Sequence, residues 1–171
     1  MKEAVGGTWL FGIVITFIIF FTTYISMSTN YAKTFKVKDE ILSIVEFYKG
    51  VNTKSIAKIN DRLDTLGYYT RGACVDNSGE QKSSSKKYSN WLGFSTSSVS
   101  STMNSRNSNY CIRRYTVSAK NDGPIGHPTS AYYQVVVFFK LDWPIIGSIF
   151  NVRVEGETSI IHMHEDSWPF T

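Results

Sequence analysis

The chain has 171 residues, of which 42% are hydrophobic and 15% aromatic, and its formal net charge is +4. This length allows one modest domain with its own core. The basic excess is too small and too scattered to indicate a nucleic-acid-binding protein, so no nucleic-acid partner is expected.

The chain begins with a segment that we predict to be a membrane-spanning helix. Residues 8–29 contain no charged side chain. A helix of that length extends about 33 Å, which matches a hydrocarbon core of about 30 Å. A cleaved secretory signal has a shorter apolar region and a small-residue cleavage site. Trp9 near one end, and Tyr24 and Tyr31 near the other, are placed like interfacial aromatic anchors. The pattern therefore favours a retained single-pass helix over a signal peptide or a buried core helix.

The same helix is predicted to continue past the membrane as an amphipathic helix. Apolar residues that share one helical face follow Tyr31 in the sequence: Val37, Ile41, Ile44, Val45 and Tyr48. Gly50 is the first natural stop, so we expect one stem helix within residues 1–50.

A second, shorter helix is expected directly after the stem. Asn52 or Thr53 can act as its N-cap, and Gly67 ends it. Its apolar stripe repeats at helical spacing: Ile56, Ile59, Leu63 and Leu66.

The second half of the chain is predicted to form an antiparallel sheet of three or four strands. Residues 149–161 alternate between apolar and polar side chains, and residues 131–142 are more continuously apolar, as in a central strand. Residues 111–120 are a third candidate, in which Arg113 and Arg114 are interpreted as a solvated surface, and residues 68–74 are an optional fourth. The expected fold class is α+β, with residues 51–171 forming an extracytoplasmic domain.

A segment rich in serine and asparagine, at about residues 77–109, separates the helices from these strands and is predicted to be a long loop. Cys74 and Cys111 flank it. A disulfide between them would contribute about 3–4 kcal/mol, mostly by restricting the unfolded chain. The alternative is two unrelated free thiols. We expect the disulfide, which requires a location outside the cytoplasm.

The orientation of the membrane helix depends on two conflicting signals. Lys33, Lys36 and Lys38 follow the apolar run and only Lys2 precedes it, which by the positive-inside rule would keep the domain in the cytoplasm. The cysteine pair and the polar segment favour the outside, and a dedicated export system can override the lysine bias. We expect the domain outside the cytoplasm.

The sequence contains no phosphate-binding glycine loop and no recognisable nucleophile motif, so a non-enzymatic protein without a cofactor is predicted. His162, His164 and Glu165 are the one candidate metal cluster, since two imidazoles and a carboxylate can bind a transition metal. By phase, the histidines extend the apolar row from Phe150 to Ile160. We therefore favour a structural role for them and expect no metal.

This plan resembles the type IV pilin-like proteins, and most of all the TadE-like pseudopilins of tight-adherence pilus systems. The shared features are a short polar N-terminus with Glu3, an uninterrupted apolar helix with an amphipathic continuation, and a small antiparallel sheet with a cysteine-closed loop. The resemblance implies that Glu3 pairs with a neighbour's terminal amine and sets subunit register. Cutting a leader at Gly6 or Gly7 would remove Glu3, so either the chain is not processed or Glu3 is an interfacial charge.

Two classes of function follow from these observations. The first is a structural or assembly component of a cell-surface filament or secretion system, whose partners are membrane lipid and other pilin-like subunits or like chains. The second is an anchored binding or sensor domain that stays alone in the membrane. Gly6, Gly7 and Gly12 favour the first class, because small residues allow helices to approach closely in lipid.

Overall fold

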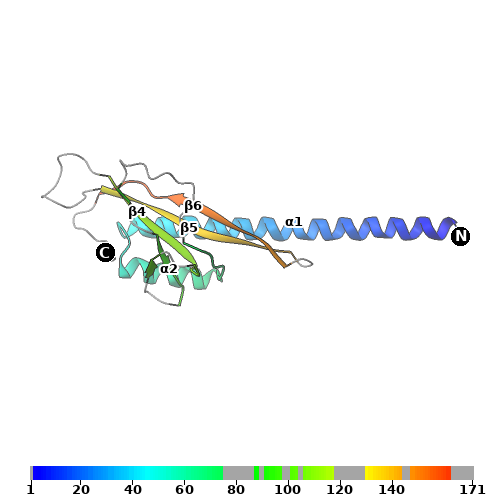
Figure 1. Cartoon of the computed structure of the whole chain (residues 1–171), viewed down its shortest axis with the longest axis horizontal. Coiled ribbons are helices and arrows are strands. Elements are labelled where there is room, and N and C mark those ends of the chain that lie inside the picture. Colours follow the sequence, from blue (N-terminus) through cyan, green and yellow to red (C-terminus); the bar gives the residue numbers. More distant parts are fainter. Residues whose placement is uncertain are drawn as a thin grey trace.

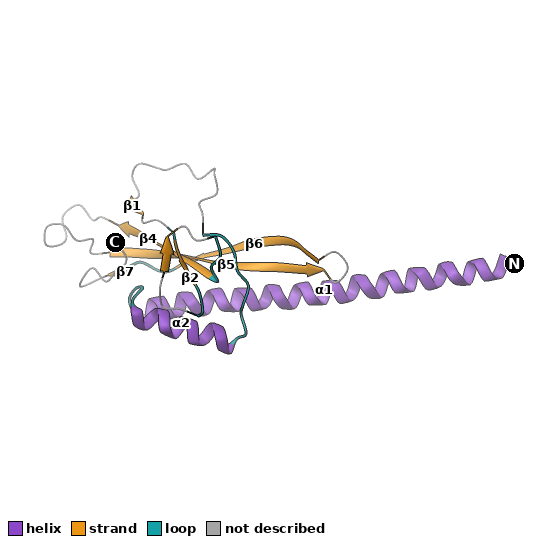
Figure 2. Ribbon diagram, turned by 60° about the horizontal axis from the view of Figure 1, so that its bottom comes forward, coloured by secondary structure: helices purple, strands orange, loops and turns teal. Residues whose placement is uncertain are grey.

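One helix, α1 (Lys2–Phe47), runs through most of the length of the molecule (Figure 1). Its N-terminal half projects alone, and its C-terminal half lies against a sheet (Figure 2). This computed structural model describes residues 2–74, 87–88, 91–97, 101–103, 106–117, 130–143 and 147–162. No glycine or proline occurs between Gly12 and Gly50, so nothing in the sequence interrupts the helix. It ends where Lys49 and Gly50 adopt φ values of 52° and 136° and Gly50 N donates to Val45 O at 2.9 Å.

The short helix α2 (Thr53–Thr65) has the predicted cap at each end. The Asn52 side chain accepts from Ser55 N at 2.8 Å, and the Ser55 hydroxyl accepts from Asn52 N at 2.9 Å, so two otherwise unpaired donors are satisfied reciprocally. At the other end Gly67 has a φ of 59°, and Tyr68 N donates to Leu63 O at 2.9 Å, as in a Schellman motif.

The remaining elements form one antiparallel sheet. The strands are β1 (Lys87–Tyr88), β2 (Leu92–Phe94), β3 (Ser101–Met103), β4 (Tyr110–Val117), β5 (Ser130–Trp143), β6 (Gly147–Glu157) and β7 (Ile161–His162). The main path is β3-β2-β4-β5-β6, while β1 pairs with β4 and β7 pairs with β5. The long strands are in register at Tyr110↔Val137 and Val137↔Val154.

The predicted α+β class, with a long helix, a short helix and an antiparallel sheet, is confirmed. The sheet is larger than predicted, because β1, β2 and β3 all lie within the serine- and asparagine-rich segment that was expected to be a loop. Residues 68–74 do not form the optional fourth strand. They contribute a single bridge between Gly72 and Ser108.

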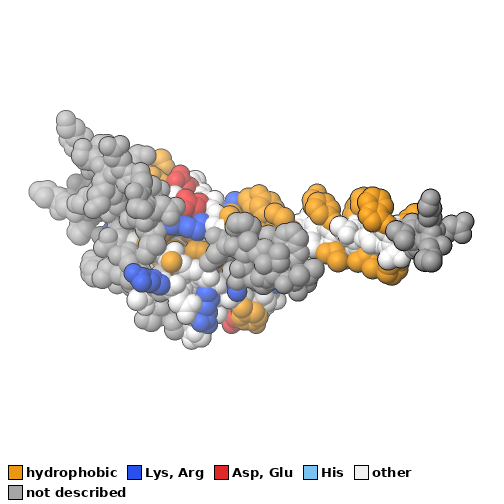
Figure 3. Space-filling view, turned by 45° about the vertical axis from the view of Figure 1, so that its right-hand side comes forward, with side chains coloured by type: hydrophobic (Ala, Val, Ile, Leu, Met, Phe, Trp, Pro, Cys, Tyr) orange, Lys and Arg blue, Asp and Glu red, His pale blue; other side chains and the backbone are white. Residues whose placement is uncertain are grey.

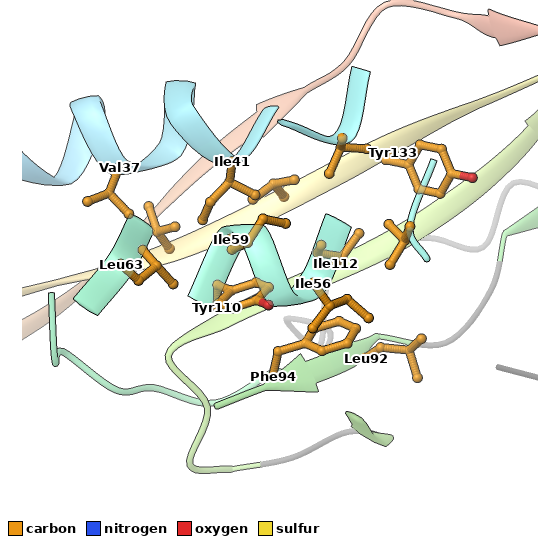
Figure 4. Packing of buried hydrophobic residues seen from close by; sticks show 14 of the residues in the cluster. Val37, Ile41, Ile56, Ile59, Leu63, Leu92, Phe94, Tyr110, Ile112 and Tyr133 are labelled. Atoms are coloured by element: carbon orange, nitrogen blue, oxygen red, sulfur yellow. The ribbon is translucent and has the colours of Figure 1, made fainter. Parts of the chain in front are cut away.

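The main core lies between the two helices and one face of the sheet (Figure 4). The buried residues that meet there come from both helices and from strands β2, β4, β5, β6 and β7, and they include Val37, Ile41, Ile56, Ile59, Leu63, Leu92, Phe94, Ile112 and Tyr133. An ion pair between Glu40 and Arg62 (2.9 Å) joins the two helices, and Glu46 accepts hydrogen bonds from both the backbone and the hydroxyl of Ser159. The last three turns of α1 are therefore part of the packed domain.

Two predictions about side-chain orientation are wrong. Arg113, expected on a solvated surface, is only 2% exposed. The apolar row from Phe150 does not continue in phase to the histidines, because β6 ends at Glu157. Beyond that end Ile160 is 57% exposed and Ile161 is buried. His162 is therefore on the exposed side of β7.

Candidate functional site

The N-terminal half of α1 (residues 7–33, here called the apolar half) exposes nearly all of its hydrophobic side chains (Figure 3). Trp9 is 74% exposed and Phe20 is 67% exposed. Within the part of the chain that the structure describes, α1 is the one helix long and apolar enough to cross a membrane. Exposure of so much contiguous apolar surface is unfavourable in water, so this half of the helix requires a lipid or protein environment.

The threonine hydroxyls of the apolar half are compatible with a lipid environment. Thr16 donates to Gly12 O at 2.9 Å, Thr23 to Ile19 O at 2.8 Å and Thr29 to Ile25 O at 2.9 Å. Thr22 bonds to the carbonyls of the preceding turn in the same way. Because these bonds are made within the helix, none of these hydroxyls needs water.

A shallow groove follows one side of the apolar half. It is lined by the small residues Thr8, Gly12 and Thr16 and, beside them, by Trp9, Ile13, Phe17 and Phe20; we call this the glycine groove. Residues spaced by four lie on one helical face. A Cβ built on Gly12 would meet nothing within 4 Å. The groove is therefore open to the close approach of another helix backbone.

The structure separates the four residues that were predicted to pack against other subunits. Gly12 lies in the glycine groove, whereas Gly7 does not line it; at about 100° per residue the two lie about 140° apart around the helix. Glu3 and Gly6 lie in the first two turns of α1. Thr8 and Thr16 were missed by the sequence analysis, although their spacing of four residues from Gly12 is a readable signal.

The second face of the sheet carries the disulfide. Cys74 and Cys111 are joined, which confirms the predicted pair. They are buried in a small cluster with Trp91, Val136 and Phe138. Trp91 precedes β2, and Cys111 is paired with Gly93 across β2 and β4. The disulfide therefore ties the segment after α2 to the centre of the sheet.

Arg113 lies on the same second face, within a ladder of aromatic and polar side chains. Its guanidinium is 4.3 Å from the Trp91 ring centroid and 4.8 Å from that of Tyr115. Its Nη2 donates to Gln134 Oε1 at 2.9 Å. The guanidinium of Arg153 is 5.5 Å from the centroid of the same Trp91 ring. These contacts explain how two arginines are accommodated on a covered sheet face.

The metal cluster is only partly described. His162 Nδ1 lies 2.9 Å from the Ser130 hydroxyl, across the pairing of β5 and β7, which is a structural hydrogen bond at a strand end. His164 and Glu165 lie outside the described residues. Among the residues that are described, no group of three or more His, Cys, Asp or Glu side chains is placed to hold a metal ion.

No family model matches the chain, and no curated protein or solved structure is significantly similar to it.

Proposed function

We propose that this chain is a single-pass membrane protein that assembles through its N-terminal helix, as pilin-like subunits do, with its α+β domain outside the cytoplasm. Its role is structural and non-enzymatic, within a surface filament or secretion system. Its partners are membrane lipid and other pilin-like subunits or further copies of the chain.

The glycine groove carries this proposal. In lipid the hydrophobic effect gives no net drive for helices to associate, so association depends on close packing at small residues. Thr8, Gly12 and Thr16 supply such a surface, and the space above Gly12 is empty in the single chain. A helix that served only as an anchor would not need this surface.

The rigid connection between α1 and the domain is a second support. The apolar half continues without a break into the core residues Val37, Ile41 and Val45. A subunit whose helices pack side by side therefore places its domain at a fixed position in the assembly. The disulfide supports the extracytoplasmic location, because disulfides persist in oxidising compartments.

In-membrane crosslinking tests the proposal directly. Single cysteines at Thr8 and Thr16 lie on the groove, and single cysteines at Val14 and Ile18 lie away from it around α1 by helical geometry. We expect oxidative crosslinks to a like chain or another pilin-like protein from the groove positions only. No crosslink from any position would make the isolated binding or sensor domain the better description.

A matched pair of substitutions separates packing from insertion. Gly12→Leu fills the groove and should abolish the crosslink through Thr16→Cys, while carbonate-resistant membrane association is kept. Val14→Leu, on the opposite side, should change neither. We expect Gly7→Leu to have a smaller effect than Gly12→Leu, because Gly7 does not line the groove.

A further inference from the structure

A second opening, at the junction between the apolar half and the domain, has a different chemistry from the glycine groove. It is bounded by α1, by the chain that follows α2 and by β5, and it encloses about 380 Å³. Its lining consists of Asn30, Lys33, Thr34, Gly67, Tyr68, Tyr69, Thr70, Phe139 and Lys140; we call it the lysine crevice. The lining includes two lysines and no carboxylate.

Lys33 is held at the edge of the lysine crevice by one hydrogen bond. Lys33 Nζ donates to the carbonyl oxygen of Gly67 at 2.8 Å. That carbonyl directly follows the C-terminus of α2, where cations are favoured. Tyr69, on the same rim, is 67% exposed. The crevice therefore combines positive charge from two elements with the hydroxyls of Tyr69 and Thr70 and the amide of Asn30, which can bind an anion. The hydroxyls of Tyr68 and Thr34 are already bonded to Phe138 and to Asn30 O.

The position of β5 shows how the crevice lies relative to the apolar half. Val135 pairs with Gly156, which lies against Lys38 and Leu42 of α1, whereas Phe139 contacts Tyr31, with ring centroids 6.3 Å apart. β5 therefore runs toward the N-terminus of α1. From Phe139 to its end at Trp143 it advances about 13 Å, which corresponds to about nine residues of helix.

The end of β5 is thus level with about residue 22 of α1. The burial pattern agrees: between Gly7 and Lys33, Ile19 and Thr23 are the only residues that are partly covered. The ends of β5 and β6 lie beside α1, beyond the rest of the domain (Figures 1 and 2).

This arrangement restricts where a bilayer can lie. A hydrocarbon core of about 30 Å takes about 20 residues of helix. From Phe139 to Trp143, β5 is paired only with β6 among the described strands, and a sheet edge of this kind cannot lie within the core.

A core that starts directly after Glu3 ends near residue 23, level with the end of β5. This core lies nearer the N-terminus than the charge-free run of residues 8–29 from which the span was predicted, so Trp9 lies within it and not at its edge. Asn30 and Lys33 are then about 10 Å and 15 Å beyond the core. The headgroup layer extends only about 5–7 Å from the core, so the crevice lies at its outer edge, where lysine side chains that point toward the bilayer can reach it.

We infer that the lysine crevice binds the phosphate headgroup of an anionic phospholipid. This inference rests on the proposed membrane anchoring of α1. The two lysines attract the headgroup charge, and the neighbouring hydroxyl and amide groups provide further hydrogen bonds to it. Lipid binding at this point would fix the depth and tilt of the domain above the membrane surface.

Native mass spectrometry of the full-length protein, released from nanodiscs, tests the inference. Nanodiscs of phosphatidylglycerol should give a retained lipid adduct, and nanodiscs of phosphatidylcholine should not. The Lys33→Gln, Lys140→Gln double variant should bind phosphatidylglycerol about 30-fold more weakly, if each lysine contributes about 1 kcal/mol near the surface. Glutamine retains a donor for the Gly67 carbonyl, so the fold should be preserved.

Lys54→Gln is the matched control, because Lys54 is an exposed lysine in the first turn of α2, about 20 Å along the helix direction from Gly67. It should leave lipid retention unchanged.

Equal retention of both lipids, or an unchanged double variant, would overturn the inference. Displacement of the lipid by millimolar inorganic phosphate would overturn it as well, since the crevice would then be a site for a soluble anion. A chain that fails to resist carbonate extraction would contradict the proposed anchoring instead, so the two failures are distinguishable.

Discussion

The hydroxyl group of Tyr68 is hydrogen-bonded to both backbone groups of Phe138: it donates to Phe138 O at 2.6 Å and accepts from Phe138 N at 2.8 Å. The pairing of β4 with β5 ends one residue earlier, at Tyr110↔Val137. Tyr68 therefore takes the place of a neighbouring strand at the first position of β5 beyond the end of β4.

Removal of this hydroxyl should destabilise the domain. In Tyr68→Phe the N–H and C=O groups of Phe138 lose their partner, and a buried unsatisfied polar group costs about 1–3 kcal/mol. Urea unfolding of the full-length protein in mild detergent, followed by tryptophan fluorescence, measures the loss. Tyr69→Phe is the control, because Tyr69 is mostly exposed and should change the free energy of unfolding by less than about 0.5 kcal/mol. Equal stability of the two variants would contradict the role given to Tyr68.

The stability of the domain should also fall at alkaline pH. Burial raises the pKa of Tyr68 and of Tyr110 above the ordinary value. Above about pH 10 the unfolded chain loses these phenolic protons and the folded chain keeps them. The free energy of unfolding should therefore decrease by up to about 1.4 kcal/mol per pH unit for each buried tyrosine. Urea midpoints between pH 9 and pH 11 measure this slope, which should be shallower in Tyr68→Phe; an identical slope in that variant would contradict the assignment.

Breaking the disulfide between Cys74 and Cys111 should lower the free energy of unfolding more than any other single covalent change. The two residues are 37 apart in sequence, and opening a loop of that length should cost about 3–4 kcal/mol. The double variant Cys74→Ala, Cys111→Ala should lower the urea midpoint by the same amount as reduction of the wild type. Protein made in its native compartment should contain no thiol that can be alkylated. Two alkylated thiols there would contradict both the bond and the extracytoplasmic location.

The histidines near the end of the described chain should bind no metal in stoichiometric amount. His162 already pairs with Ser130, and a structural hydrogen bond at a strand end accounts for it. Elemental analysis of the full-length protein provides the measurement. One equivalent of metal that is lost in the His162→Ala, His164→Ala variant would show that these imidazoles are ligands.

The helices were predictable from sequence because their signals are local. The apolar stripe of Val37, Ile41 and Val45, the stop at Gly50 and the cap at Asn52 all depend on residues within a few positions of one another. The same holds for the four-residue spacing of the glycine groove, of which only Gly12 was recognised.

The environment of Arg113 was not predictable, because its neighbours come from distant parts of the chain. Its ring partner Trp91 belongs to a segment whose polar composition indicates a loop, and it is brought to Arg113 by the pairing of β2 with β4. The side of the sheet on which His162 lies was predicted wrongly for a related reason. Thr158 leaves the ladder of β6 and bonds to Tyr133 through both its backbone N–H and its hydroxyl. The alternation of buried and exposed side chains therefore starts again after Thr158.

The unbroken passage of α1 from the apolar half into the core has a mechanical consequence. A pull on the N-terminal end is carried along the helix axis and loads the interface between α1 and the sheet in shear, so Val37, Ile41 and Val45 resist it together. The Glu46 contacts to Ser159 lie at the far end of the same interface. No flexible joint separates the two halves of α1, so the helix and the domain move together as one rigid body under tension.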